Sequence, residues 1–465
     1  MRKIKFVLVA ILVPAVMLFA YVPANAANPA QDLAARAALL ADVDSGLVLF
    51  EYNMDLRHPA DALTKVMTLL LAVSACEAGT ANPSDIIEMT ESAYYNITAM
   101  STTQNILPGE RLTLLDLMYS AYVGNANEAC NMIAEHIAGS VVRFIEMMNE
   151  LAEELGCKNT NFTNTNGQFN DSQRTSAMDQ FIIFREAMTY PLFVEISSTF
   201  RYELGETNMS EPRRLTNSNL LLSPNSKYYY RPCTSGIASA TYEGGYSLVS
   251  LSEANGLSLI CVILGSDDFI YDDESVDLRN FTETQRIVEW GLSQFSRRTI
   301  LSSVDLVDKA PVINGAGADF VNLRPESSIE LLLNNDILDE DFVKTVTIYS
   351  VESGETLSAP ISAGDVLGEV TVTRDGMDYG TILLVASTSI ELHRLEFIRM
   401  QVNDIMASST TRNIIWVLVF IVLGYAALVI RHNVLRRKRI RKIEDAKRHL
   451  MQERQNQNQN QNQTR

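Results

Sequence analysis

The feature that most constrains the fold of this chain is an uncharged apolar run near its C-terminus. Residues 414–430 read IIWVLVFIVLGYAALVI. At about 1.5 Å per helical residue this run spans roughly 26 Å, close to the thickness of the hydrocarbon core of a bilayer. Basic residues crowd the segment that follows, and an excess of lysine and arginine marks the cytoplasmic flank of a membrane helix. The sequence therefore predicts one transmembrane helix over 414–430 and a cytoplasmic tail over 431–465.

The N-terminus predicts that the rest of the chain is exported. Residues 1–26 begin with Arg2, Lys3 and Lys5, continue through an apolar run and close on Ala-Asn-Ala, which is the layout of a secretory signal peptide. The expected localisation is the cell membrane, with a single span, a large extracytoplasmic part and a mostly polar stalk over 391–413. The low-complexity Gln/Asn-rich end of the tail is expected to be disordered.

Charge is divided unevenly along the chain. The formal net charge is −18 although the tail is basic, so the exported part is strongly acidic. An acidic surface repels polyanions, which excludes nucleic acid and anionic lipid as ligands of that part. The tail lies beside a membrane helix, so its basic charge is explained by membrane topology and by contact with lipid headgroups. A further possibility is that the tail recruits cytoplasmic partners and is the working part of the protein.

Cysteine and histidine give no indication of metal, cofactor or disulfide chemistry. The five histidines are scattered without the spacing of metal ligands. The cysteines are odd in number, widely spaced and without a CxxC pair, and most lie in apolar surroundings. Buried free thiols are expected at Cys76, Cys130, Cys157, Cys233 and Cys261.

The exported part begins as a mixture of strands and helices. Two apolar runs around Asp44-Ser45-Gly46 predict a β-hairpin within residues 37–52. Helical periodicity with glycine stops predicts helices over 65–76, 114–138 and 141–155. Between residues 228 and 265 the pattern returns to strands, read as YYYRP, YSLVSLS and LSLICVILG.

After about residue 297 the pattern changes to short alternating strands separated by polar turns. VKTVTIYSV and GEVTVTRDGMDYGTILLVAS are typical of such strands, and Asp375-Gly376 is expected to turn a hairpin in the second. The sequence therefore predicts a separate β domain over 297–390.

The start of the helix predicted at 65–76 has the frame of a catalytic motif without its nucleophile. In a Ser-x-x-Lys motif the two residues share a helical face, so the lysine amine can take the serine proton and leave an alkoxide. The stretch HPADALTKVMTLLLA keeps Lys65 but has Ala62 three residues earlier. An alanine methyl group cannot attack a carbonyl, so covalent catalysis through this position is excluded.

These surroundings resemble the D-alanyl-D-alanine carboxypeptidase family, the low-molecular-weight penicillin-binding proteins, whose equivalent stretch reads like PASLTKLMT. LPGERLTLLDLMYSAYVGNANEACNMIAEHIAGS, residues 107–140, is similar to the family segment around its second motif. The resemblance extends over roughly residues 35–395. It implies an α/β (α+β) beta-lactamase/transpeptidase-like domain over 27–296, followed by the small all-β domain and the C-terminal transmembrane helix.

The resemblance also implies where the site residues lie, because the family has three active-site motifs: SxxK, SxN and KTG. Here the nucleophile, the second serine and the lysine that faces the substrate carboxylate are all replaced. The matching positions are Ala62 and Lys65 for SxxK, Val123 and Asn125 for SxN, and Thr234, Ser235 and Gly236 for KTG.

Neighbouring side chains are not expected to replace the lost nucleophile. Thr64 points to a different helical face, and a carboxylate such as Asp61 is a weak acyl-transfer nucleophile. Asp61 is instead expected to cap the helix and to hold Lys65 as a structural cation. Asn125 is expected to be a buried amide that ties two helices together.

The sequence thus predicts a membrane-anchored cell-envelope protein of this family in peptidoglycan metabolism that no longer hydrolyses D-Ala-D-Ala. It would act as a binding or scaffold protein. Its partner ligands would be peptidoglycan stem peptides, bound more weakly than by the family's active members. The alternative is an active serine-type D-Ala-D-Ala carboxypeptidase with a displaced nucleophile, which trims the terminal D-Ala of those peptides.

Overall fold

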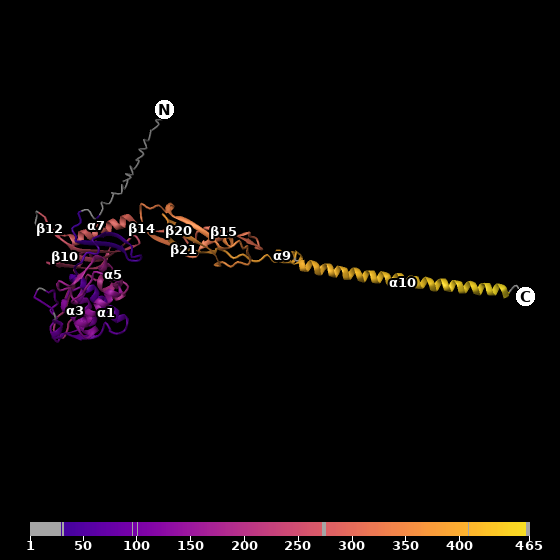
Figure 1. Cartoon of the computed structure of the whole chain (residues 1–465). Helices are drawn as coiled ribbons and strands as arrows, with labels where there is room; N and C mark the ends of the chain where they lie inside the picture. Colours follow the sequence, from indigo (N-terminus) through magenta and orange to yellow (C-terminus); the bar gives the residue numbers. More distant parts are fainter. Residues whose placement is uncertain are drawn as a thin grey trace, which may run out of the picture. The chain divides into compact units, whose positions relative to one another are not determined.

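The structure is a computed structural model that describes residues 29, 32–94, 96–99, 101–271, 276–407 and 409–461. The predicted signal peptide over 1–26 lies outside these residues. The chain divides into two compact units, each described separately below (Figure 1). Unit 1 comprises Met1–Thr299 with Glu330–Asp339, and unit 2 comprises Ile300–Ile329 with Glu340–Arg465.

Unit 1 is built on a five-stranded antiparallel sheet in the order β2-β1-β11-β10-β9. The predicted hairpin at its edge is confirmed, and the carboxylate of Asp42 fixes the turn by accepting hydrogen bonds from the backbone N–H and the hydroxyl of Ser45, at 2.8 and 2.7 Å. The strands are β1 (Ala37–Asp42), β2 (Val48–Tyr52), β9 (Cys233–Thr241), β10 (Gly245–Ala254) and β11 (Leu257–Ser266).

The strand predicted from YYYRP is wrong, whereas the other two strands of that region are confirmed. Residues 228–232 form a turn and irregular backbone before β9. Two features explain the difference: Pro232 has no N–H to donate to a ladder, and the Tyr228 ring packs against Phe281 of α7 at a centroid distance of 5.1 Å.

Helices cover both faces of this sheet, as the alternation of β1 requires. Leu39 and Ala41 pack into a core shared with α1–α6, whereas Ala38 and Leu40 pack toward α7 on the opposite face (Figure 1). The helices are α1 (Thr64–Glu77), α2 (Leu114–Tyr122), α3 (Asn127–Ala138), α4 (Val141–Glu154), α5 (Ala177–Ala187), α6 (Pro191–Ser198) and α7 (Arg279–Gln294).

The helix predicted over 114–138 is broken in two, and this break positions the site described below. The backbone of Asn125 is left-handed, with φ of 52°, so the α-helical path ends before it and restarts at Asn127. Four residues, 123–126, therefore separate α2 from α3.

Short elements complete unit 1. A 3₁₀ turn, η1 (Asp61–Leu63), leads into α1, and further 3₁₀ turns are η2 (Glu91–Tyr94) and η3 (Leu220–Leu222). The short antiparallel pairs are β3 (His58–Pro59) with β6 (Arg174–Thr175), β4 (Ile86–Glu88) with β5 (Arg111–Thr113), β7 (Arg201–Leu204) with β8 (Arg213–Thr216), and β12 (Asp268–Ile270) with β13 (Val276–Leu278).

Unit 2 contains a six-stranded sheet in the order β18-β20-β21-β16-β15-β19. The predicted hairpin is confirmed: Asp375 and Gly376 both have positive φ, 51° and 79°, as a tight turn between β20 and β21 requires. The strands are β15 (Asp308–Ile313), β16 (Phe320–Pro325), β18 (Val343–Ile348), β19 (Leu357–Ser358), β20 (Val366–Arg374) and β21 (Met377–Ala386), with η4 (Asp339–Asp341) and α8 (Tyr349–Glu352) beside them. A separate pair, β14 (Phe295–Leu301) with β17 (Ile329–Asn334), falls mostly within the residues of unit 1.

The chain ends in two helices, α9 (Arg394–Ala407) and α10 (Ser409–Gln461). Within the described ranges, α10 is the one helix with a stretch long and apolar enough to cross a membrane, inside Arg412–Glu453. The helix continues to Gln461, so the Gln/Asn-rich end is helical over most of its length where the sequence predicted disorder. Glutamine has a favourable helix propensity, so the segment can continue the helix that precedes it. A prediction from composition alone does not take that preceding helix into account.

Candidate functional site

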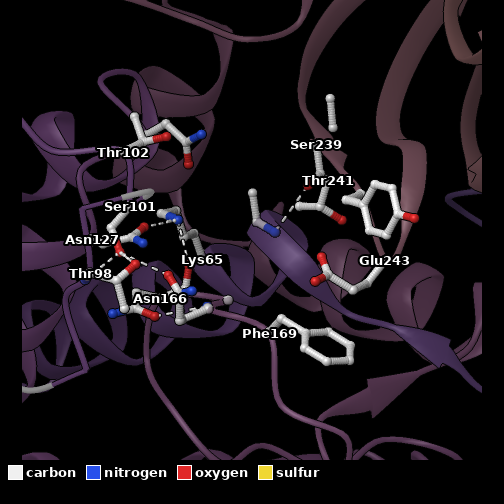
Figure 2. Close-up of a pocket in the computed structure, with 16 residues that line it drawn as sticks. Lys65, Thr98, Ser101, Thr102, Asn127, Asn166, Phe169, Ser239, Thr241 and Glu243 are labelled. Carbon is white, nitrogen blue, oxygen red and sulfur yellow. Dashed lines mark hydrogen bonds between the residues drawn. The ribbon is translucent and has the colours of Figure 1, made fainter.

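A cleft of about 480 Å³ lies in unit 1 where the start of α1 meets the end of β9. Figure 2 shows Lys65 on one side of this cleft and Ser239, Thr241 and Glu243 across from it. Five segments supply the lining: Ala62 and Lys65; Thr98, Ser101 and Thr102; Asn125 and Asn127; Asn166, Gly167, Gln168 and Phe169; and Ser239, Ala240, Thr241, Tyr242 and Glu243.

Lys65 is held at the base of the cleft by two oxygen acceptors. Its side chain is 2% exposed, and Nζ donates to Oδ1 of Asn127 at 2.8 Å and to the backbone carbonyl of Asn166 (Figure 2). Burial lowers the pKa of Lys65, and the nearby Cys130, Glu128 and Asp61 oppose that shift. The prediction that Asp61 holds Lys65 is wrong, because two asparagines do so.

Ala62 stands one helical turn before Lys65, as the motif frame predicts. Its backbone N–H donates to Oγ of Ser239 at 3.2 Å, which joins the start of α1 to β9. Lys65 donates one hydrogen bond to Asn127 and one to Asn166. In the described part of the chain, no hydroxyl group is hydrogen-bonded to this amine, so it has none to deprotonate.

Asp61 is not the helix cap that its position suggested. The residues at the N-cap positions of η1 and α1 are Ala60 and Leu63, and neither makes a side-chain capping bond. The backbone of Asp61 is left-handed, with φ of 43°, and its Oδ2 accepts a hydrogen bond from Oγ1 of Thr241 at 2.9 Å. The carboxylate therefore braces the end of β9 against the start of α1.

Burial raises the pKa of Asp61 to about 6. The hydrogen bond from Thr241 opposes this shift, the charge of Glu243 adds to it, and Lys65 opposes it weakly. The Oδ1 atom of Asp61 is buried without a hydrogen-bond partner. The carboxyl group is thus costly to ionise where it lies.

The structure corrects the residues assigned to the second motif. Val123 is fully buried in the hydrophobic core and does not line the cleft. Asn125 lines the cleft, and its Oδ1 has no partner, so it does not tie helices together. Asn127, which the sequence reading missed, is the residue that contacts Lys65. The helix break places both asparagines of Asn125-Ala126-Asn127 at the cleft, a spacing that could have indicated them.

The structure also corrects the residues assigned to the third motif. Thr234, Ser235 and Gly236 lie at the beginning of β9, and Oγ of Ser235 donates to Oγ of Ser197 at 2.7 Å, away from the cleft. At about 3.3 Å per residue, Thr234 lies roughly 16 Å from Ser239 along the strand. The cleft is instead lined by the end of β9, where Ser239, Ala240 and Thr241 carry no positive charge.

A buried loop between α4 and β6 was also missed. Gly167 has φ of 86°, and a Cβ atom there would lie 1.9 Å from the carbonyl oxygen of Asp61, so only glycine allows this loop to approach η1. Asn166 is 1% exposed; its Oδ1 accepts from the N–H of Gln168 at 2.9 Å, while its Nδ2 has no partner. These contacts join residues about a hundred positions apart in sequence, which no local pattern reveals.

The charge balance of the cleft is unusual for a site that would hold a carboxylate. Lys65 and Glu243 are the charged residues that line it, and Lys65 is buried and engaged. Among the described residues no group of His, Cys, Asp and Glu has the arrangement of a metal site. The arrangement offers hydrogen-bonding amides and hydroxyls, but neither a nucleophile beside the lysine nor a free cation.

Comparisons with known proteins give a consistent result. The family model described as D-alanyl-D-alanine carboxypeptidase matches residues 23–268, and the model described as penicillin-binding protein 5, C-terminal domain, matches residues 295–392. The chain is 28% identical to the D-alanyl-D-alanine carboxypeptidase DacF of Bacillus subtilis over 344 residues, which covers 74% of this chain and 82% of the relative. It is 26% identical to DacC of Escherichia coli, covering 77% and 84%.

Solved structures share the fold. Penicillin binding protein 5 from Haemophilus influenzae matches with a TM-score of 0.57 and 24% identity, over 77% of this chain and 98% of that chain. A peptidoglycan synthesis regulatory factor (PBP3) from Streptococcus pneumoniae matches with a TM-score of 0.58 and 23% identity, over 77% and 100%.

Proposed function

The chain belongs to the D-alanyl-D-alanine carboxypeptidase family, and from this premise we propose that it binds peptidoglycan stem peptides at the cell envelope without hydrolysing them. The family supplies the ligand class. The absence of hydrolysis rests on one observation in the cleft: the residue that precedes Lys65 by one helical turn, where the nucleophile would stand, is Ala62.

The chemical consequence of Ala62 is large. Removing the nucleophile of a serine hydrolase costs on the order of 10⁶ in rate, because no acyl-enzyme can form. Lys65, the residue that matches the general base, donates to Asn127 and Asn166. Asn127 takes the role that the sequence reading gave to Asn125, since it is the amide that orients the lysine.

The hydroxyl nearest to Ala62 in the hydrogen-bond network belongs to Ser239, which makes it the candidate for a displaced nucleophile. Its Oγ accepts the N–H of Ala62 at 3.2 Å and makes no hydrogen bond to Lys65. A serine activated for attack needs a base within hydrogen-bond reach of its proton. An active carboxypeptidase that uses Ser239 would therefore need another base, so the inactive binding protein is the better-supported function.

The proposed placement in the cell follows from the ends of the chain. Residues 1–26 direct export, 27–296 form the family domain, 297–390 the β domain, 391–413 the stalk, and 414–430 the single span. The basic residues after 430 favour a cytoplasmic tail over 431–465. The cleft would then face the extracytoplasmic side, where peptidoglycan lies.

The test uses the full-length protein in detergent micelles. Incubation with a fluorescent penicillin, followed by intact-mass measurement, is expected to give no covalent adduct. Titration with a stem pentapeptide ending in D-Ala-D-Ala is expected to give saturable binding without release of D-alanine. A stoichiometric adduct would establish the active alternative, and peptide mapping would then identify its nucleophile. Absence of both adduct and binding would overturn the binding role.

A further inference from the structure

The cleft is depleted of positive charge on the wall that β9 provides. Ser239, Ala240 and Thr241 line it with hydroxyl and methyl groups, and the turn that follows adds Glu243, which is exposed. Arg174, whose charge acts on Asp61, lies with its guanidinium carbon 5.8 Å from the centroid of the Phe169 ring and donates to the carbonyls of neighbouring loop residues. It does not line the cleft.

Negative groups surround this wall and its base. Glu243 lines the cleft, and the carboxyl group of Asp61 lies behind Thr241, to which it is hydrogen-bonded. Glu128 is fully buried on α3, and it acts on Lys65 together with Asp61. The cation that lines the cleft, Lys65, is buried at its base and donates to Asn127 and Asn166, whereas Glu243 lies exposed on the wall where a ligand carboxylate would enter. The negative charge of a ligand carboxylate is repelled by the carboxylates of Glu243 and Asp61.

Among the described residues, two amide atoms of the lining have no hydrogen-bond partner, one of them a donor and the other an acceptor. Nδ2 of Asn166 is a donor on a side chain that is 1% exposed, and Oδ1 of Asn125 is an acceptor. Both residues line the same cleft. A buried polar atom without a partner is costly, so each of these atoms gains when a ligand satisfies it. A secondary or primary amide offers the carbonyl oxygen and the N–H that these two atoms require.

We propose that the cleft selects its ligand by the charge of the terminal group, binding a D-alanyl peptide whose end is an uncharged amide and excluding the free carboxylate. This inference rests on the proposed function, because it assumes that the ligand is a stem peptide. Glu243 and Asp61 determine the exclusion, and Asn166 and Asn125 receive the amide. Such an uncharged end exists wherever the D-alanine carboxyl group is joined to an amine of a neighbouring peptide.

The experiment compares two ligands that differ only at the terminal group. Diacetyl-L-lysyl-D-alanyl-D-alanine and its C-terminal carboxamide are titrated into the full-length protein in detergent at low ionic strength, and dissociation constants are measured by ligand-observed NMR. The carboxamide is expected to bind about tenfold more tightly than the acid. Added salt is expected to reduce the difference, because it screens the repulsion of the acid.

Three variants separate the effect of the charge at Glu243 from the effect of the amide at Asn125. Glu243→Lys is expected to strengthen binding of the acid and to reduce the ratio toward one. Glu253→Lys makes the same change of charge at the far end of β10, also on an exposed residue, and is expected to leave the ratio unchanged. Asn125→Gly keeps the left-handed backbone and removes the amide oxygen, so the carboxamide is expected to bind about fivefold more weakly.

The outcomes distinguish the inference from the function on which it rests. Equal affinities, or tighter binding of the acid, would overturn the charge selection while leaving stem-peptide binding in place. Failure of both ligands to bind would overturn the proposed function as well. A ratio that Glu253→Lys changes as much as Glu243→Lys would also overturn the inference, because the effect would then reflect net charge rather than the cleft.

Discussion

The two walls of the cleft differ in how much of the family's catalytic frame they contain. The α1 wall keeps Lys65, and the partners of this lysine are fixed through Asn127 of α3 and the loop at Asn166. The β9 wall has no cation, and an acid follows it at Glu243. The α1 wall thus keeps a lysine in the position of a general base. The β9 wall presents a negative charge, whereas binding of a carboxylate requires a positive one.

Burial explains this difference. Lys65, Asn127 and Asn166 are 2%, 6% and 1% exposed, and each satisfies a polar atom of another, so losing one leaves the others unpaired in the interior. Glu243 and Tyr242 are exposed, and their replacement leaves no buried group unsatisfied. The buried residues of the α1 wall therefore stabilise the fold whatever chemistry the cleft performs, whereas the exposed residues of the β9 wall contribute little to it.

Restoring the nucleophile tests how complete the α1 wall is. Ala62→Ser is expected to form a covalent adduct with a fluorescent penicillin, about 10³ faster than the background of the unchanged protein, because Lys65 lies on the same helical face. Part of the rate stays lost, since β9 offers no cation. Adduct formation is measured by intact mass against time. A folded variant with no adduct would mean that the α1 wall has lost its catalytic geometry too.

Removing the lysine tests its structural role. Lys65→Met keeps the length of the side chain and leaves Oδ1 of Asn127 and the carbonyl of Asn166 unpaired. We expect the free energy of unfolding to fall by about 3 kcal/mol, measured by chemical denaturation. The control is Lys158→Met at an exposed position, with an expected change below about 0.5 kcal/mol. An equal effect of both changes would contradict a structural role for the buried amine.

Sequence reasoning succeeded where the site is local and failed where it depends on tertiary packing. Ala62 and Lys65 lie on one helical turn, so their relation follows from spacing alone. Val-Gly-Asn resembles the second motif and so indicated Val123, but the left-handed backbone of Asn125 places Asn125 and Asn127 at the cleft and leaves Val123 in the core.

The third motif was misplaced for a related reason. The position of each β9 residue along the cleft depends on the register with β10, in which Ser239 lies opposite Ser247 and Thr241 opposite Gly245. Thr234, five residues before Ser239, lies at the end of β9 opposite to the cleft. The fold class could be predicted from the resemblance to the family, and the two hairpins and the helices near 65–76 and 141–155 from turn residues and periodicity that act within a few residues.

Asp61 connects the two walls, and its ionisation should weaken the fold. Its pKa of about 6 exceeds the ordinary value of 3.8, so the folded protein binds more protons than the unfolded chain between these values. Stability is therefore lost as pH rises from about 4 to about 6, by roughly 3 kcal/mol at 1.36 kcal/mol per unit of pKa. Asp61→Asn still accepts from Thr241 and should remove this decline, as measured by denaturation across that pH range. An unchanged pH profile would show that Asp61 is not the group responsible.

The smallest expected effect isolates the coupling between the β9 wall and the α1 wall. Glu243 raises the pKa of Asp61 by like-charge repulsion, so Glu243→Gln should move the stability decline of the preceding experiment to lower pH. Because Glu243 is exposed, the stability at acidic pH should change by less than about 0.5 kcal/mol. The double variant with Asp61→Asn should show no further shift, since the responding group is then absent. A shift that persists in the double variant would place the response on another carboxyl group, and the charge of the β9 wall would then act on the fold independently of Asp61.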